Sequence, residues 1–230
     1  MPTLLILCAA ALIFASAATV LRREATPQTA AQQDYGRIPL AFEANRGQTA
    51  EAVNFLARGA GYTLFLKPDE AVFALSRQSA PPREDEQGEE RQAGAPPSRA
   101  AETPAVLRMR LVGADAGAAA EGADELGGKV NYLVGDDPAK WRTGVPTFAR
   151  VRYRGVYPGI DLVYYGNQRQ LEYDFVVAPG RDPRAVKLDF EGADTVELDA
   201  GGDLLLRLGE ELIRQPKPHV YQEAGGARPP

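Results

Sequence analysis

The sequence predicts an all-β fold, an antiparallel β-sandwich built from short strands and hairpins. Short runs in which apolar and polar residues alternate recur throughout the chain after residue 37. Turn-forming residues separate these runs at close spacing, and no long helical period follows the N-terminal segment. Alternation with a period of two is typical of a strand with one buried face, and many short strands between turns favour a sandwich over alternating strands and helices.

The chain opens with an apolar run followed by small residues, and Ala15-Ser16-Ala17 fits the Ala-x-Ala form of a secretory cleavage site. Residues 1–18 are therefore predicted to be a signal peptide, and the protein to be exported to the extracellular space or the cell surface. No charged side chain precedes the run, and Arg22 and Arg23 follow it. An uncleaved N-terminal helix that anchors the protein in a membrane stays open as the alternative.

Residues 19–36 are polar and rich in Ala, Gln and Thr, which predicts a flexible lead-in. Residues 37–230 are predicted to form the β-sandwich domain, interrupted at 77–103 by a Pro-, Glu- and Arg-rich loop insertion with almost nothing to bury. This insertion is predicted to be disordered or a long solvated loop. The chain stops just after a strand, so we expect a domain truncated at its C-terminus.

The individual strands are predicted from apolar alternation and from the turns beside them. The clearest pair spans residues 160–164 and 171–177, which form a hairpin because Gly166-Asn167-Gln168-Arg169 between them tolerates positive φ. Residues 114–124 are rich in Ala and Gly and predict at most a weak helix. Residues 62–67 and 71–76 flank Pro68-Asp69-Glu70 and are predicted to form a second hairpin by the same turn logic. The other predicted strands lie at residues 40–44, 106–112, 129–134, 148–153, 185–190, 195–198, 204–208, 211–214 and 218–222.

Composition limits the functions that the chain can have. The formal net charge is −5, and no block of Lys or Arg stands out, which argues against nucleic acid as a partner. The only cysteine, Cys8, lies in the signal, so the processed chain would have no disulfide. One histidine and one cysteine cannot form a zinc site, and no glycine-rich phosphate loop is present. We therefore predict no cofactor, no metal and no catalytic residue.

Carboxylates are the remaining route to catalysis. Glu172 and Asp174 are two positions apart, so both lie on the face of their strand opposite its apolar residues, and Asp161 lies on the matching face of the preceding strand. Acid pairs on one sheet face are a common arrangement in glycosidases. The favoured interpretation is a solvated face on which arginines pair with the acids. The candidate arginines are Arg152, Arg154 and Arg169.

Aromatic residues suggest a second kind of site, a stacking surface for sugars. Trp141 and Tyr165 are its candidates, together with Asp161, Glu172 and Asp174 as ligand-binding groups. Tyr153, Tyr157, Tyr164 and Tyr173 could join the same surface. Alternation sends some of these tyrosines inward, so most of them are expected to lie in the core or in cross-strand pairs.

Six ordered segments resemble an uncharacterised domain that precedes the SBBP (β-propeller) repeats of large exported bacterial surface proteins. They are Phe42-Glu-Ala-Asn-Arg-Gly-Gln48, Phe55-Leu-Ala-Arg-Gly-Ala-Gly-Tyr62, Lys129-Val-Asn-Tyr-Leu-Val-Gly135, Trp141-Arg142, Val156-Tyr-Pro-Gly-Ile-Asp-Leu162 and Leu171-Glu-Tyr-Asp-Phe-Val-Val-Ala-Pro-Gly-Arg-Asp-Pro183.

The resemblance implies an exported, β-rich, non-catalytic structural or interaction module, with downstream β-propeller repeats in full-length relatives. This chain lacks such repeats. Expected partners are a cell-surface glycan or a protein. The alternatives are a carbohydrate-binding module and, ranked last, a carboxylate-based glycosidase.

Overall fold

The computed structural model describes residues 6–15, 39–76, 105–167 and 170–221, and of residues 6–15 only the backbone. The described part is all-β, apart from two short 3₁₀ turns at Pro138–Lys140 and Pro183–Ala185. The predicted lead-in at 19–36 and the predicted insertion at 77–103 lie outside the described residues.

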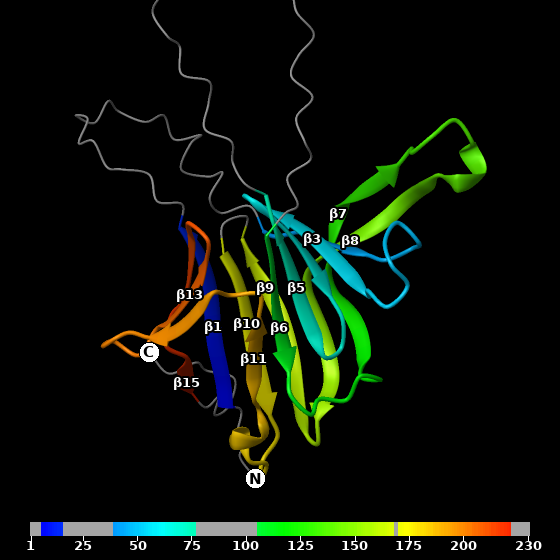
Figure 1. Cartoon of the computed structure of the whole chain (residues 1–230). Helices are drawn as coiled ribbons and strands as arrows, with labels where there is room; N and C mark the ends of the chain where they lie inside the picture. Colours follow the sequence, from blue (N-terminus) through cyan, green and yellow to red (C-terminus); the bar gives the residue numbers. More distant parts are fainter. Residues whose placement is uncertain (1–5, 16–38, 77–104, 168–169, 222–230) are drawn as a thin grey trace, which may run out of the picture.

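Within the described residues, fifteen strands form one antiparallel sheet (Figure 1). Their bounds are β1 Ile6–Ala15, β2 Phe42–Ala44, β3 Phe55–Gly59, β4 Tyr62–Leu66, β5 Glu70–Leu75, β6 Ala105–Leu111, β7 Ala119–Tyr132, β8 Arg142–Tyr157, β9 Ile160–Asn167, β10 Gln170–Val177, β11 Leu188–Glu191, β12 Thr195–Leu198, β13 Leu204–Leu208, β14 Glu211–Gln215 and β15 His219–Tyr221.

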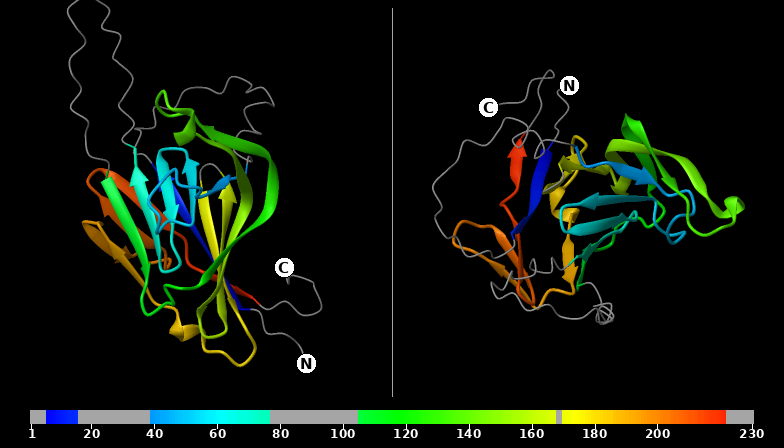
Figure 2. Two further views of the ribbon diagram at one scale, coloured as in Figure 1. Left: turned by 90° about the vertical axis from the view of Figure 1, so that its right-hand side faces the viewer. Right: turned by 90° about the horizontal axis from the view of Figure 1, so that it is seen from above.

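The prediction of two packed sheets is not confirmed, because a single sheet curls on itself into a half-barrel, as Figure 2 shows from the side and from above. The strand order is β11-β6-β5-β4-β3-β2-β8-β9-β10-β1-β14-β13-β12, while β7 pairs with β8 and β15 with β1. Twist accumulates across many strands and bends a long sheet toward closure. The apolar faces of distant strands can then bury one another without a second sheet.

The inner face of the curl is the core. Along β9, Ile160, Leu162 and Tyr164 are buried, while the residues between them face outward. The neighbouring strand β10 repeats the pattern, with Tyr173 opposite Tyr164. Strands β13 and β14 contribute Leu206, Leu208 and Ile213 to the same cluster. These strands therefore share one interior, to which β12 and β15 contribute no residue.

The two clearest hairpin predictions are confirmed. Strands β9 and β10 pair antiparallel from Ile160 with Val177 to Asn167 with Gln170, around a turn whose residues 168–169 lie outside the described part. Strands β4 and β5 pair in the same way. In both hairpins, turn residues and apolar alternation specify the same register, which is why the local pattern was sufficient.

The weak helix expected at residues 114–124 is wrong. Residues from Ala119 onward form β7, which pairs with β8 in a long hairpin. Gly122 has a role in this pairing, since a Cβ there would lie 2.6 Å from the Phe148 ring. Partner contacts across the hairpin override the helical preference of an Ala-rich stretch.

The N-terminal segment, which was predicted to be a signal peptide, forms a strand of the sheet. Ile6–Ala15 forms β1, which pairs with β10 over eight positions and with β14 and β15 over three each. It therefore lies inside the sheet, between β10 and β14. An apolar run suits a central strand as well as an export signal, so composition cannot separate the two.

Candidate functional site

The three candidate carboxylates share the outer face of β9 and β10, as the alternation predicted. In the register of this pair, Glu172 lies opposite Tyr165, and Asp174 lies opposite Val163. Asp161 lies further along, opposite Val176. The acids are therefore spread along the two strands, and each has its own surroundings.

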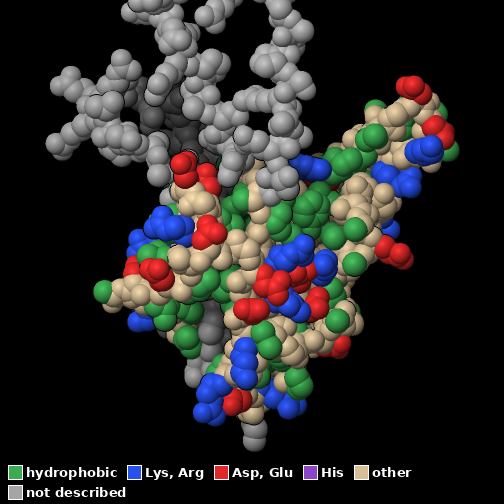
Figure 3. All heavy atoms as spheres, viewed as in Figure 1, with side chains coloured by type: hydrophobic (Ala, Val, Ile, Leu, Met, Phe, Trp, Pro, Cys, Tyr) green, Lys and Arg blue, Asp and Glu red, His purple; other side chains and the backbone are tan. Residues whose placement is uncertain are grey.

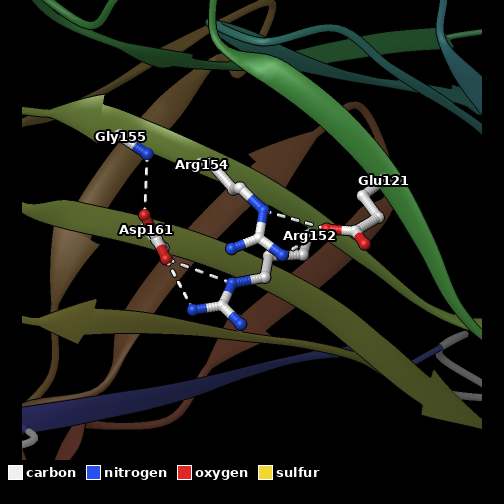
Figure 4. Close-up of polar contacts among 5 residues, drawn as sticks. All are labelled: Glu121, Arg152, Arg154, Gly155 and Asp161. Atoms are coloured by element: carbon white, nitrogen blue, oxygen red, sulfur yellow. Dashed lines mark hydrogen bonds and ion pairs between the residues drawn. The ribbon is translucent and has the colours of Figure 1, made fainter.

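Asp161 is held by the neighbouring strand β8 (Figure 4). Its Oδ2 accepts hydrogen bonds from Arg152 Nε at 3.1 Å and Nη2 at 2.6 Å. Its Oδ1 accepts one from the Gly155 N–H at 2.7 Å. Gly155 has a φ of +64° and lies where the β8–β9 register shifts, which is the geometry of a bulge. Asp161 thus fixes a backbone irregularity, a structural role that its sequence position did not reveal.

The arginine pairing expected for the candidate acids is confirmed for Arg152, which binds Asp161, whereas Arg154 pairs with a different acid, Glu121. Arg154 donates to Glu121 Oε2 on β7 from Nε at 2.9 Å and from Nη2 at 2.6 Å (Figure 4). Arg169, the third candidate, lies outside the described residues. Both acids in these pairs are bound to guanidinium groups, which leaves them poorly suited to acid–base chemistry.

Asp174 and Tyr165 are the candidates that the fold brings into contact. The Tyr165 hydroxyl donates to Asp174 Oδ1 at 3.1 Å, and Asp174 is only 4% exposed. Burial, followed by the nearby Asp174 carboxylate, raises the pKa of Tyr165 well above its ordinary value. The phenol therefore keeps its proton and stays a hydrogen-bond donor. Glu172 is half-buried beside them.

The inward tyrosines cannot form a sugar-stacking surface. Tyr153, Tyr164 and Tyr173 are at most 1% exposed, and Tyr157 is 4% exposed. The Tyr153 and Tyr164 rings meet edge to face with their centroids 6.1 Å apart. Burial raises the pKa of both hydroxyls, which stay protonated inside the core. The expectation that most tyrosines lie in the core is confirmed for these four.

Trp141 lies far along the chain from the acids, just before β8, in the turn that closes the β7–β8 hairpin. Its Nε1 donates to the Gly135 carbonyl at 3.0 Å. The next residue, Arg142, donates from Nε to the Arg46 carbonyl at 3.0 Å and so joins the hairpin to the loop between β2 and β3. Trp141 and the outer-face acids therefore belong to different parts of the molecule.

A buried polar group that includes Tyr132, the last residue of β7, was not predicted from the sequence. Glu43 on β2 is 5% exposed and accepts from both Arg58 on β3 and the Tyr132 hydroxyl on β7. Arg58 Nη2 donates to the same hydroxyl at 2.8 Å, and its guanidinium lies 5.5 Å from the Tyr132 ring centre. The three residues are far apart in sequence, and their types alone gave no signal. Together they fix the hairpin to the sheet.

Charge on the surface is mixed in sign. Figure 3 shows basic and acidic side chains interspersed over the face in view. Within the described ranges, no cluster of three or more His, Cys, Asp or Glu side chains could hold a metal ion. The same ranges include no helix that is long and apolar enough to cross a membrane.

The chain matches one known protein family. Residues 42–230 match a domain of unknown function, DUF7948, and the chain belongs to this family. The match makes no link to SBBP repeats, so that part of the resemblance stays a prediction. No curated protein and no solved structure is detectably similar to the chain.

Proposed function

We propose that this DUF7948 domain is a non-catalytic interaction module of an exported bacterial surface protein, and that it contacts a protein partner through the tip of the β7–β8 hairpin. The observation that carries the proposal is the pair Leu133 and Val134. These adjacent residues follow β7 and are 59% and 72% exposed. The hairpin projects from the rest of the sheet (Figure 1), so both side chains lie on a protruding element.

The tip is an ordered structure. Asp137 caps the short 3₁₀ turn at Pro138–Lys140 by accepting from the Ala139 N–H at 3.0 Å, and Trp141 closes onto Gly135. The Glu43–Arg58–Tyr132 group holds the end of β7 from which the tip begins. Apolar side chains on a rigid, protruding turn lose little conformational entropy when a partner buries them. Such a tip suits an apolar recess on another protein.

The geometry gives less support to a carboxylate-based glycosidase. Asp161 is engaged by Arg152 and by the bulge at Gly155, while Asp174 bonds to Tyr165. Within the described part, these groups do not form an isolated pair facing each other across a cleft. Hydrolysis of a glycan by the purified chain, lost on Glu172→Gln, would overturn the non-catalytic proposal.

The experiment compares surface retention of three forms expressed in a bacterial host. The double variant Leu133→Asp with Val134→Asp is expected to move from the cell surface to the medium, because charged side chains cannot enter an apolar recess. Leu198→Asp is the matched control, since Leu198 is 74% exposed on the distant strand β12. Equal retention of the double variant and the unchanged chain would contradict the proposal.

Export is part of this proposal and has a separate measurement. N-terminal sequencing of the surface form is expected to show that residues 1–18 are absent. Their removal would take away β1 and leave β10 and β14 as facing edges. A surface form that begins at Met1 would contradict the predicted cleavage.

A further inference from the structure

A cavity of about 420 Å³ lies between the β2–β3 loop and the beginning of β7. It is lined by Asn45, Gly47, Thr49, Glu51, Val53, Asn54, Phe55 and Ala120. This volume is within the range of pockets that bind small molecules. The tip residues Leu133 and Val134 and the acids on β9 and β10 are not among its lining residues.

The loop that forms the cavity is fixed by its own hydrogen bonds. Asn45 Nδ2 donates to the carbonyls of Ala50 at 2.9 Å and Val53 at 2.8 Å. Its Oδ1 accepts from the N–H groups of Gly47 at 3.0 Å and Thr49 at 3.4 Å. The Asn45 amide is therefore fully used in shaping the loop. A cavity with walls fixed in this way is pre-formed, which lowers the cost of binding.

Three other polar side chains in the lining have no such role. Among the described residues, the Thr49 hydroxyl, the Glu51 carboxylate and the Asn54 amide have no hydrogen-bond partner. Asn54 Oδ1 is also enclosed by protein atoms and unbonded. A buried polar atom without a partner needs an explanation, such as a site that a ligand or water completes.

The remaining lining is apolar. Val53 and Phe55 are each 6% exposed, and Phe55 packs edge to face against Phe148 with ring centres 5.9 Å apart. Together with Ala120, these residues give the cavity an apolar wall next to its hydroxyl, carboxylate and amide groups. A ligand that fits must have both an apolar face and several hydrogen-bonding groups.

The charge of the cavity lining limits the kinds of ligand that can bind there. Glu51 is an acid in the lining, which disfavours an anion, and a single carboxylate is a poor set of ligands for a divalent cation. A sugar ring has an apolar face of C–H groups and an edge of hydroxyls, which a carboxylate, an amide and a hydroxyl can bind. We propose that the cavity between the β2–β3 loop and β7 is a binding site for a neutral sugar, with Glu51, Asn54 and Thr49 as its hydrogen-bonding groups.

The test titrates the full chain with neutral sugars, namely glucose, galactose and N-acetylglucosamine, and follows binding by calorimetry. Glu51→Gln keeps the size of the side chain and is expected to weaken binding about tenfold or more, because hydrogen bonds to a charged group are the stronger ones. Asn54→Ala is expected to weaken binding as well. Thermal unfolding of each variant verifies that it is folded.

Glu172→Gln on β10 is the matched control, because it makes the same chemical change on the outer face and should leave the affinity unchanged. Loss of binding in Glu172→Gln, with binding retained in Glu51→Gln, would assign the sugar to the outer face and overturn this site. Absence of binding by all three sugars at millimolar concentration would overturn it too. Neither result depends on the hairpin tip, so this inference and the proposed function can fail separately.

Discussion

Strands β8 to β10 have two faces that use the same alternating sequence in opposite ways. On the inner face, Tyr153, Tyr164 and Tyr173 bury their rings against one another. On the outer face, Arg152 and Asp161 bond across the strands. The inner face buries aromatic side chains, and the outer face joins neighbouring strands by hydrogen-bonded ion pairs. Two of the candidate acids on the outer face, Asp161 and Asp174, bond to protein side chains, whereas the groups that we propose for binding line the cavity beside β7.

The largest effect is expected from the inner face. Tyr164→Ala removes a fully buried ring and should lower the free energy of unfolding by about 3–5 kcal/mol. Tyr164→Phe is the matched control, because the Tyr164 hydroxyl has no hydrogen-bond partner among the described residues. Its stability should be unchanged or higher by about 1 kcal/mol. Urea denaturation measures both, and a large loss in Tyr164→Phe would show that the hydroxyl is satisfied.

A smaller effect is expected at the bulge on the outer face. Asp161→Ala removes the acceptor of Arg152 and of the Gly155 N–H and should cost about 1–3 kcal/mol in unfolding free energy. Asp161→Asn should cost less, since its amide oxygen still accepts from Gly155. If both substitutions leave urea denaturation unchanged, the bulge does not depend on this carboxylate.

Glu70 on β5 makes the stability of the fold depend on pH. Burial alone would raise the pKa of Glu70, but hydrogen bonds from Lys67 and Arg108 outweigh it and hold the pKa below its ordinary value of 4.5. The folded pKa is the lower one, so this stabilisation is present above pH 4.5 and is lost as the pH falls through the folded pKa. Glu70→Gln should cost roughly 1 kcal/mol at pH 7.

The measurement for Glu70 is the difference in unfolding free energy between the unchanged chain and Glu70→Gln, taken at several pH values. This difference should shrink below pH 4.5 as the carboxylate becomes protonated. A difference that stays constant down to the acid limit would show that the ion pairs of Glu70 do not stabilise the fold.

The smallest effect is expected for the exposed pair between Glu121 and Arg154, whose side chains are 52% and 56% exposed. Glu121→Gln should change the unfolding free energy by about 0.5 kcal/mol or less, because solvent screens the charges. The change should disappear in high salt. If Glu121→Gln lowers the unfolding free energy as much as Asp161→Ala does, exposure of an ion pair does not determine its contribution to stability.

The sequence by itself determined the all-β class, the two clear hairpins and the face of each candidate acid. These depend on side-chain alternation and turn residues, which are properties of neighbouring positions. Tyr164 facing inward and Asp161 facing outward follow from a period of two.

Only the tertiary structure decided that one sheet curls in place of two sheets packing, that residues from Ala119 onward form a strand, and that Ile6–Ala15 pairs with β10. The tertiary structure also decided the group formed by Glu43, Arg58 and Tyr132 and the cavity between the β2–β3 loop and β7. Each of these features joins segments that are distant in the chain. Partner contacts decide them, and local propensity does not encode which distant segment will supply the partner.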